Sequence, residues 1–145
     1  GTMTNISHMI EKDVPLNLAL GIVFDTEKKK ILIAKRKKQA YITGLTWCFP
    51  GAKIDYEQDL EEAIKLGIKE KTGLRVESLG SIFAETHLRN EGKLFSVYYL
   101  CELISGKEKL SDEFEEMKWI SPSEVEEHFE TELHPVLREY LESLG

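Results

Sequence analysis

The sequence is short of cysteine, of net positive charge and of long apolar runs. Its two cysteines, Cys48 and Cys101, form no C-x-x-C pair, which excludes a disulfide framework and makes a reducing compartment the default. The formal net charge of -7 argues against sequence-independent binding of duplex nucleic acid. The longest early apolar run, Leu16 to Phe24, is interrupted by Asn17 and is too short to span a membrane. We therefore expect a soluble cytoplasmic protein that binds neither duplex nucleic acid nor membrane.

The composition is that of a small globular domain. The chain has 145 residues, of which 41% are hydrophobic, and this is enough apolar material for one core. Internal repeats, low-complexity tracts and Ser/Gly-rich linkers are absent from the sequence, so no domain boundary is expected within residues 1–145. Residues 1–9 are expected to be a tag remnant or a disordered start, because Gly1 and Thr2 precede the first methionine.

The order of predicted elements indicates an α/β domain in which helices cover a mixed sheet. Apolar runs bounded by turn residues predict strands, and a Pro followed by an apolar stripe predicts the last helix. The predicted strands are Leu18–Phe24, Ile31–Ala34, Arg75–Phe83, Leu94–Leu103 and Met117–Ile120, and the last helix begins at His134-Pro135.

The clearest element is a helix from Leu60 to Thr72. Asp59 is a good N-cap, and Glu62 three residues later completes a capping-box pattern. Gly73 supplies the stop. An apolar stripe at helical spacing, formed by Leu60, Ala63, Ile64 and Ile68, predicts the face that packs on the sheet.

This helix and the run before it resemble the signature of the Nudix (MutT-like) hydrolases. Trp47-x-Phe49-Pro50-Gly51 is similar to the strand and turn that enter the Nudix box, and the helix up to Gly73-Leu74 is similar to the box helix. The late segment Met117–Ile120, followed by Pro122-Ser123-Glu124-Val125, is also similar to the family. The resemblance implies an α/β/α sandwich, a mixed sheet flanked by helices.

The family's box, G-x5-E-x7-R-E-U-x-E-E-x-G-U with U aliphatic, clusters carboxylates on one helix face. Those oxygens hold Mg²⁺ or Mn²⁺, which activates water and neutralises charge on a diphosphate. At the six polar or glycine positions before the closing Gly73-Leu74, this chain has, in order, Ala52, Gln58, Leu66, Gly67, Glu70 and Lys71.

Of the implied catalytic carboxylates only Glu70 remains, with the backbone of Gly51 as a second metal ligand. We therefore expect no ordered cation in the standard two-metal arrangement and name no firm cofactor. Gly67 costs about 1 kcal/mol relative to alanine inside a helix, so it either makes room for close packing or reflects a lost constraint. On propensity alone, Gly67→Glu strengthens the helix by up to about 0.8 kcal/mol and, with Lys71→Glu, rebuilds a cluster around Glu70.

Three functions follow from the resemblance. The first is a module that binds a nucleotide or nucleoside diphosphate derivative without metal, through Arg36, Trp47, Lys53 and Lys71. The second is an active hydrolase that uses Mg²⁺ or Mn²⁺ in a rearranged site built from displaced acids such as Glu57, Glu85 and Glu113–Glu116. The third is a protein-interaction or scaffold domain with a vestigial site, for which a homodimer through the final helix is one form.

The basic stretch between Lys28 and Lys38 has two interpretations. It contains seven lysine or arginine residues within eleven positions. It is either a solvated hairpin edge that lysines protect from aggregation or a rim that faces phosphate.

Overall fold

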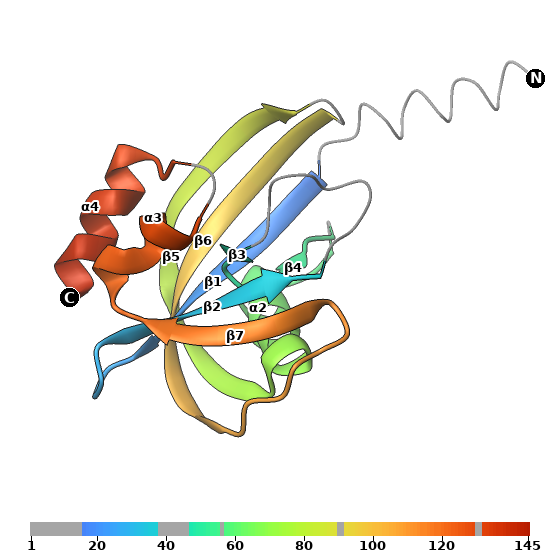
Figure 1. The fold of residues 1–145 in the computed structure, drawn as a ribbon. Helices are drawn as coiled ribbons and strands as arrows, with labels where there is room; N and C mark the ends of the chain where they lie inside the picture. Colours follow the sequence, from blue (N-terminus) through green and yellow to red (C-terminus); the bar gives the residue numbers. More distant parts are fainter. Residues whose placement is uncertain (1–15, 38–46, 56, 90–91, 130–131) are drawn as a thin grey trace, which may run out of the picture.

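The computed structural model describes residues 16–37, 47–55, 57–89, 92–129 and 132–145 (Figure 1). The expected tag remnant or disordered start at 1–9 lies outside these ranges. The elements, in chain order, are β1 (Leu16–Asp25), β2 (Lys30–Arg36), β3 (Trp47–Cys48), β4 (Gly51–Lys53), α2 (Leu60–Thr72), β5 (Leu74–Arg89), β6 (Gly92–Gly106), β7 (Phe114–Ile120), a 3-10 turn (Pro122–Glu124), α3 (Val125–His128) and α4 (Pro135–Leu144).

The strands form one mixed sheet with β1 near its centre. The main path runs β3-β2-β1-β6-β5, and β1 pairs parallel with β6 and antiparallel with β2. Two strands lie off this path, because β4 pairs with β1 and β7 pairs with β2. Through these pairings, β1 and β2 bring the segment around β3 and β4 next to β7, which is distant in sequence.

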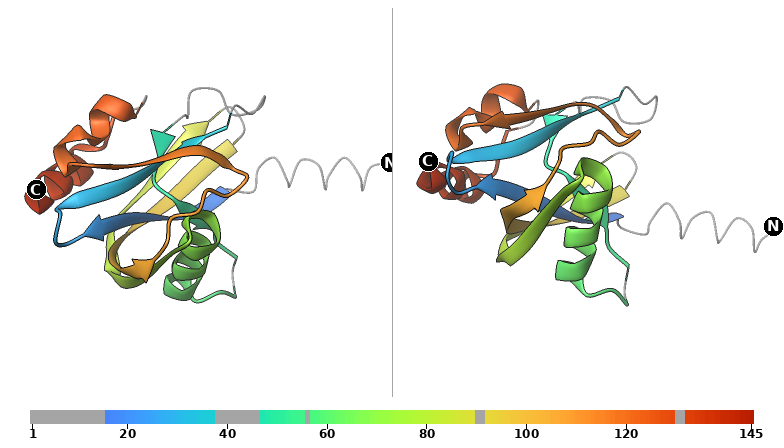
Figure 2. Two further views of the ribbon diagram at one scale, coloured as in Figure 1. Left: turned by 60° about the horizontal axis from the view of Figure 1, so that its bottom comes forward. Right: turned by 90° about the horizontal axis from the view of Figure 1, so that it is seen from below.

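Alternate residues of β1 and β2 supply two apolar layers, one on each face of the sheet. On one face, Val23 and Leu32 pack with Ile64 and Ile68 of α2. On the other face, the inward residues of the same strands pack with the apolar stripe of α4. Figures 1 and 2 show α2 on one side of the strands and the α3–α4 pair on the other. The fold is therefore an α/β/α sandwich, as predicted.

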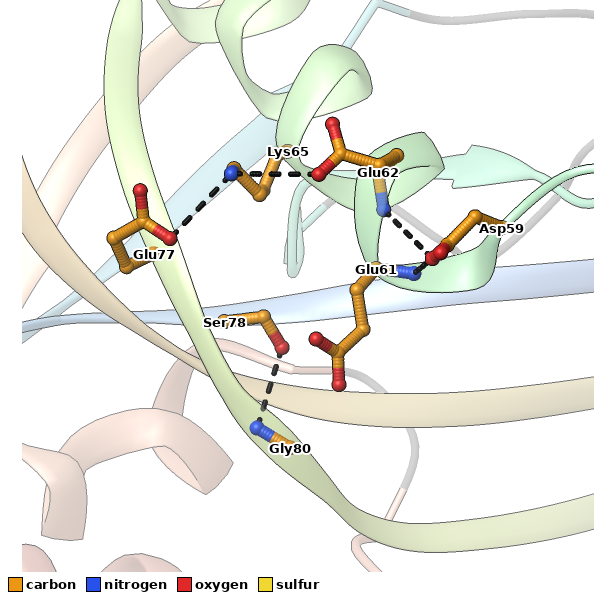
Figure 3. A network of polar contacts seen from close by, with 7 residues as sticks. All are labelled: Asp59, Glu61, Glu62, Lys65, Glu77, Ser78 and Gly80. Atoms are coloured by element: carbon orange, nitrogen blue, oxygen red, sulfur yellow. Dashed lines mark hydrogen bonds and ion pairs between the residues drawn. The ribbon is translucent and has the colours of Figure 1, made fainter.

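Helix α2 has the predicted bounds because local signals set both ends. The Asp59 carboxylate accepts hydrogen bonds from the backbone N–H of Glu61 at 3.0 Å and of Glu62 at 3.3 Å (Figure 3). At the other end Gly73 has φ 79°, in the left-handed region that glycine adopts readily. The Glu62 carboxylate pairs with Lys65 at 3.6 Å, so it takes a different partner from the one that a capping box predicts.

The strands are longer than the apolar runs predicted. The pairing of β5 with β6 continues from Leu74 to Arg89 and passes through register shifts between Ser78 and Phe83. Every helix in the described ranges is too short or too polar to cross a bilayer.

Candidate functional site

The segment that resembles the box is fastened to the central strand by backbone contacts. The Gly21 N–H donates to the Pro50 carbonyl at 2.8 Å, and Gly51 pairs with Leu20 across β1 and β4. A Cβ on Gly51 would lie 2.2 Å from the Ala19 carbonyl oxygen, so no larger residue fits there. This close approach explains why Gly51 is present and fixes the position of Ala52 after it.

Helix α2 meets β4 at Gly67. A Cβ built on Gly67 would lie 2.7 Å from the Ala52 Cβ and 3.3 Å from the Gly51 carbonyl oxygen. Of the two explanations for this mid-helix glycine, the structure supports close packing. The expectation that Gly67→Glu strengthens the helix is therefore wrong for that change alone, because propensity ignores the methyl group of Ala52.

Four residues from four parts of the sequence come near one another at the C-terminal end of α2, and we call Arg36, Cys48, Lys71 and Glu113 the Lys71 cluster. The Lys71 ammonium lies 3.5 Å from the Glu113 carboxylate. The backbone N–H of Lys37 donates to the Glu113 carbonyl at 3.0 Å and so holds that residue beside β2. In this cluster Lys71 stands at a glutamate position of the family pattern, whereas Arg36 and Glu113 come from outside the box.

Arg36 and Lys71 both lie near enough to the Cys48 thiol to influence its pKa. Burial raises the pKa of the Cys48 thiol, while the nearby Arg36 and Lys71 charges act in the opposite direction. The Arg36 Nε atom is buried and has no hydrogen-bond partner among the residues that the structure describes. Arg36 and Lys71 therefore both lie near a thiol whose raised pKa keeps it protonated at neutral pH.

In the part of the chain that the structure describes, the remaining carboxylates of α2 do not gather as a two-metal site requires. Glu70 is exposed, and Lys71 beside it carries the opposite charge. Within the described ranges, no three His, Cys, Asp or Glu side chains gather closely enough to hold a metal ion. An ammonium group repels a divalent cation, which needs oxygen ligands. These residues do not fit the two-metal arrangement that the resemblance implies.

The displaced acids have other partners. Glu85 accepts a hydrogen bond from the Tyr98 hydroxyl at 3.0 Å and lies 2.8 Å from His87 Nε2. Burial and the Glu85 carboxylate raise the pKa of Tyr98, which keeps its hydroxyl as a donor. Glu61, a further acid in the first turn of α2, directs its carboxylate toward Ser78 and away from Lys65 (Figure 3). Glu113, in contrast, lies at the Lys71 cluster, 3.5 Å from the Lys71 ammonium.

Trp47 and Lys53 lie apart from the Lys71 cluster. Trp47 packs against the core layer on the α3–α4 face. The Lys118 ammonium lies 5.6 Å from its ring centroid, and the ring of His128 meets it edge-on at the same distance. Lys53 is exposed and follows Ala52, whose methyl faces α2, so the Lys53 side chain leaves the opposite side of β4.

The residues of the basic stretch between Lys28 and Lys38 have different environments, so neither the hairpin-edge nor the phosphate-rim interpretation describes all of them. Arg36 joins the Lys71 cluster, whereas Lys35 pairs with Glu115 at 3.2 Å and Lys30 donates to the Ser121 hydroxyl at 3.0 Å. Lys28 and Lys29 are exposed in the β1–β2 turn. Lys38 lies outside the described residues.

The partner of Lys71 could not be predicted, because Glu113 is distant in sequence and only the pairing of β2 with β7 brings it near.

Sequence relatives of this chain act on nucleotide derivatives. The chain is 31% identical over 94 residues to an ADP-ribose pyrophosphatase of Methanocaldococcus jannaschii, covering 62% of this chain and 53% of that protein. It is 35% identical over 60 residues to an 8-oxo-dGTP diphosphatase of Buchnera aphidicola subsp. Schizaphis graminum, covering 41% of this chain and 44% of that protein. The chain thus spans about half the length of each relative.

The same fold is found in solved structures. A MutT protein from Methanosarcina mazei Go1 aligns with TM-score 0.74 at 19% identity, over 91% of this chain and 94% of that one. A MutT NUDIX hydrolase from Burkholderia pseudomallei aligns with TM-score 0.69 at 22% identity, over 92% and 100%. The family model of the NUDIX domain matches residues 15–144. With the strand, turn and capped helix of the box in place, and a match over nearly the whole chain, this protein belongs to the Nudix family.

Proposed function

We propose that this Nudix domain binds a nucleoside-diphosphate-linked ligand through Arg36 and Lys71, and that it does so without a divalent cation. The observation that carries the proposal is the Lys71 cluster, in which an ammonium stands at a carboxylate position of the box and Arg36 lies near the same thiol, Cys48. The relatives named for ADP-ribose and 8-oxo-dGTP support the ligand class, because both compounds contain linked phosphates.

The chemistry of the two cations suits a diphosphate. Arg36 offers a planar set of N–H donors that can grip two phosphate oxygens, and Lys71 offers a compact charge. Lys71 is partly buried, with 23% of its side chain exposed, so its charge is less screened than that of a lysine at the open surface. Glu113 neutralises Lys71 in the free protein, and an incoming phosphate competes with it for the ammonium.

Titration calorimetry in EDTA tests the proposal, with ADP-ribose and 8-oxo-dGTP as ligands. Lys71→Met should weaken binding about tenfold or more, as expected for the loss of one hydrogen bond to a charged group. Lys69→Met is the matched control, because Lys69 is an exposed lysine of the same helix, and it should leave the dissociation constant within about twofold. Equal losses in the two variants would contradict a specific role for Lys71.

A turnover assay separates binding from the alternative of an active hydrolase. With Mg²⁺ or Mn²⁺ present, we expect both ligands to stay intact over hours. Hydrolysis at ordinary enzyme rates, on the order of 1–10 per second, would overturn the proposal and show that a rearranged acidic site works.

A further inference from the structure

The contact between α2 and β4 depends on two small residues that face each other. Gly67 is buried in the middle of α2, and Ala52 lies opposite it in β4. The space between them holds one methyl group, because a Cβ on Gly67 would approach the Ala52 Cβ to 2.7 Å. Real Cβ atoms do not come so close, and both atoms belong to rigid backbone elements, so neither can move aside like the end of a long side chain.

The two positions have exchanged sizes relative to the box pattern. The pattern has its glycine at the position of Ala52 and its glutamate at the position of Gly67. In this chain the larger residue, Ala52, lies in the strand, and the residue without a side chain, Gly67, lies in the helix. The nearest backbone acceptor to a side chain at position 67 is the Gly51 carbonyl oxygen, at 3.3 Å from the Cβ position. The Ala52 methyl therefore fills the region in which a side chain from position 67 would approach this oxygen.

We propose that the side-chain sizes at positions 52 and 67 depend on each other, and that the contact between Ala52 and Gly67 holds α2 against β4. We call this contact the lock. The lock, and not only the loss of negative charge, excludes a divalent cation from the surface between α2 and β4. A carboxylate at position 67 can return only after Ala52 becomes glycine. This inference concerns packing and does not require that the domain bind a nucleotide.

A double-mutant cycle of thermal unfolding tests the coupling. Gly67→Ala alone should lower the Tm by about 4 °C or more, because the second methyl has no room. In a chain that already carries Ala52→Gly, the same change should raise the Tm, because the methyl then fits and alanine favours the helix. Equal effects of Gly67→Ala in the two backgrounds would overturn the proposal.

Amide hydrogen exchange provides a second test, which applies even if the proteins that carry Gly67→Ala do not fold. The single variant Ala52→Gly leaves a gap between α2 and β4, so the amides of residues 64–71 should exchange at least about threefold faster than in the unaltered protein. Unchanged protection of these amides would show that Ala52 does not hold the helix.

Titration with Mn²⁺ tests the exclusion of cations, without any assay of activity. Gly67→Glu with Lys71→Glu should bind Mn²⁺ at least about tenfold more weakly than the same pair combined with Ala52→Gly. Equal affinities in the two proteins would show that charge alone excludes the cation and would overturn this part of the proposal. Because no nucleotide is present, the result is independent of whether Arg36 and Lys71 bind a diphosphate.

Discussion

The Glu113 carboxylate should weaken the binding of any phosphate that Lys71 holds. It lies 3.5 Å from the Lys71 ammonium, and half of its side chain is exposed. A phosphate oxygen on the same ammonium would lie about 5 Å from this carboxylate, and at an effective dielectric constant of about 60 the repulsion is about 1 kcal/mol. Glu113→Gln should therefore tighten the binding of ADP-ribose in EDTA about sixfold.

Titration calorimetry at two salt concentrations measures this effect. The gain should shrink at high salt, because both side chains are partly exposed and their charges are screened. Glu115→Gln is a matched control, since Glu115 lies two residues further along the chain, in β7, and pairs with Lys35 at 3.2 Å. The reasoning is refuted if Glu113→Gln tightens binding no more than Glu115→Gln does. The folded state itself should change by less than about 1 kcal/mol in either variant.

Three further predictions concern stability. Ile68 is fully buried under the sheet, so Ile68→Ala should cost about 2–5 kcal/mol in urea unfolding, and a cost below 1 kcal/mol would contradict the core assignment. Asp59→Ala removes the cap of α2 and should cost about 1 kcal/mol by the same measurement. Burial raises the pKa of the Cys101 thiol from 9.0 to about 12, so the unfolded chain loses this proton first and stability falls as the pH rises through this range. Cys101→Ala should flatten that fall in unfolding curves recorded from pH 9 upward.

The elements that could be predicted are those with signals close together in the sequence. The bounds of α2 are set by Asp59 and Gly73, which lie at its two ends, and by a stripe of apolar residues between them. The apolar pattern predicts shorter strands than the observed β5 and β6, because their pairing continues through exposed and irregular positions where apolar alternation stops. The fold class followed from the order of elements, since few topologies place helices on both faces of such a sheet.

The contacts of the candidate site could not be predicted from the sequence. The sequence named Arg36 and Lys71, and it offered two explanations for Gly67. Only the pairing of β1 with β4 shows that Ala52 faces this glycine. The sequence places Trp47 at the entry to the same box, yet strand alternation puts its ring on the opposite face of the sheet. Adjacent residues in a strand point apart, so proximity in sequence does not bring their side chains into one site.

The central claim is that a diphosphate binds this domain without a divalent cation, and the metal dependence of binding tests it most directly. ADP-ribose is titrated into the protein by calorimetry, once in EDTA and once in excess Mg²⁺. Because Arg36 and Lys71 supply the positive charge, the two dissociation constants should agree within about threefold. Binding that appears only with Mg²⁺, or that is at least about tenfold tighter with it, would contradict the account and show that Glu70 and other acids still hold a metal.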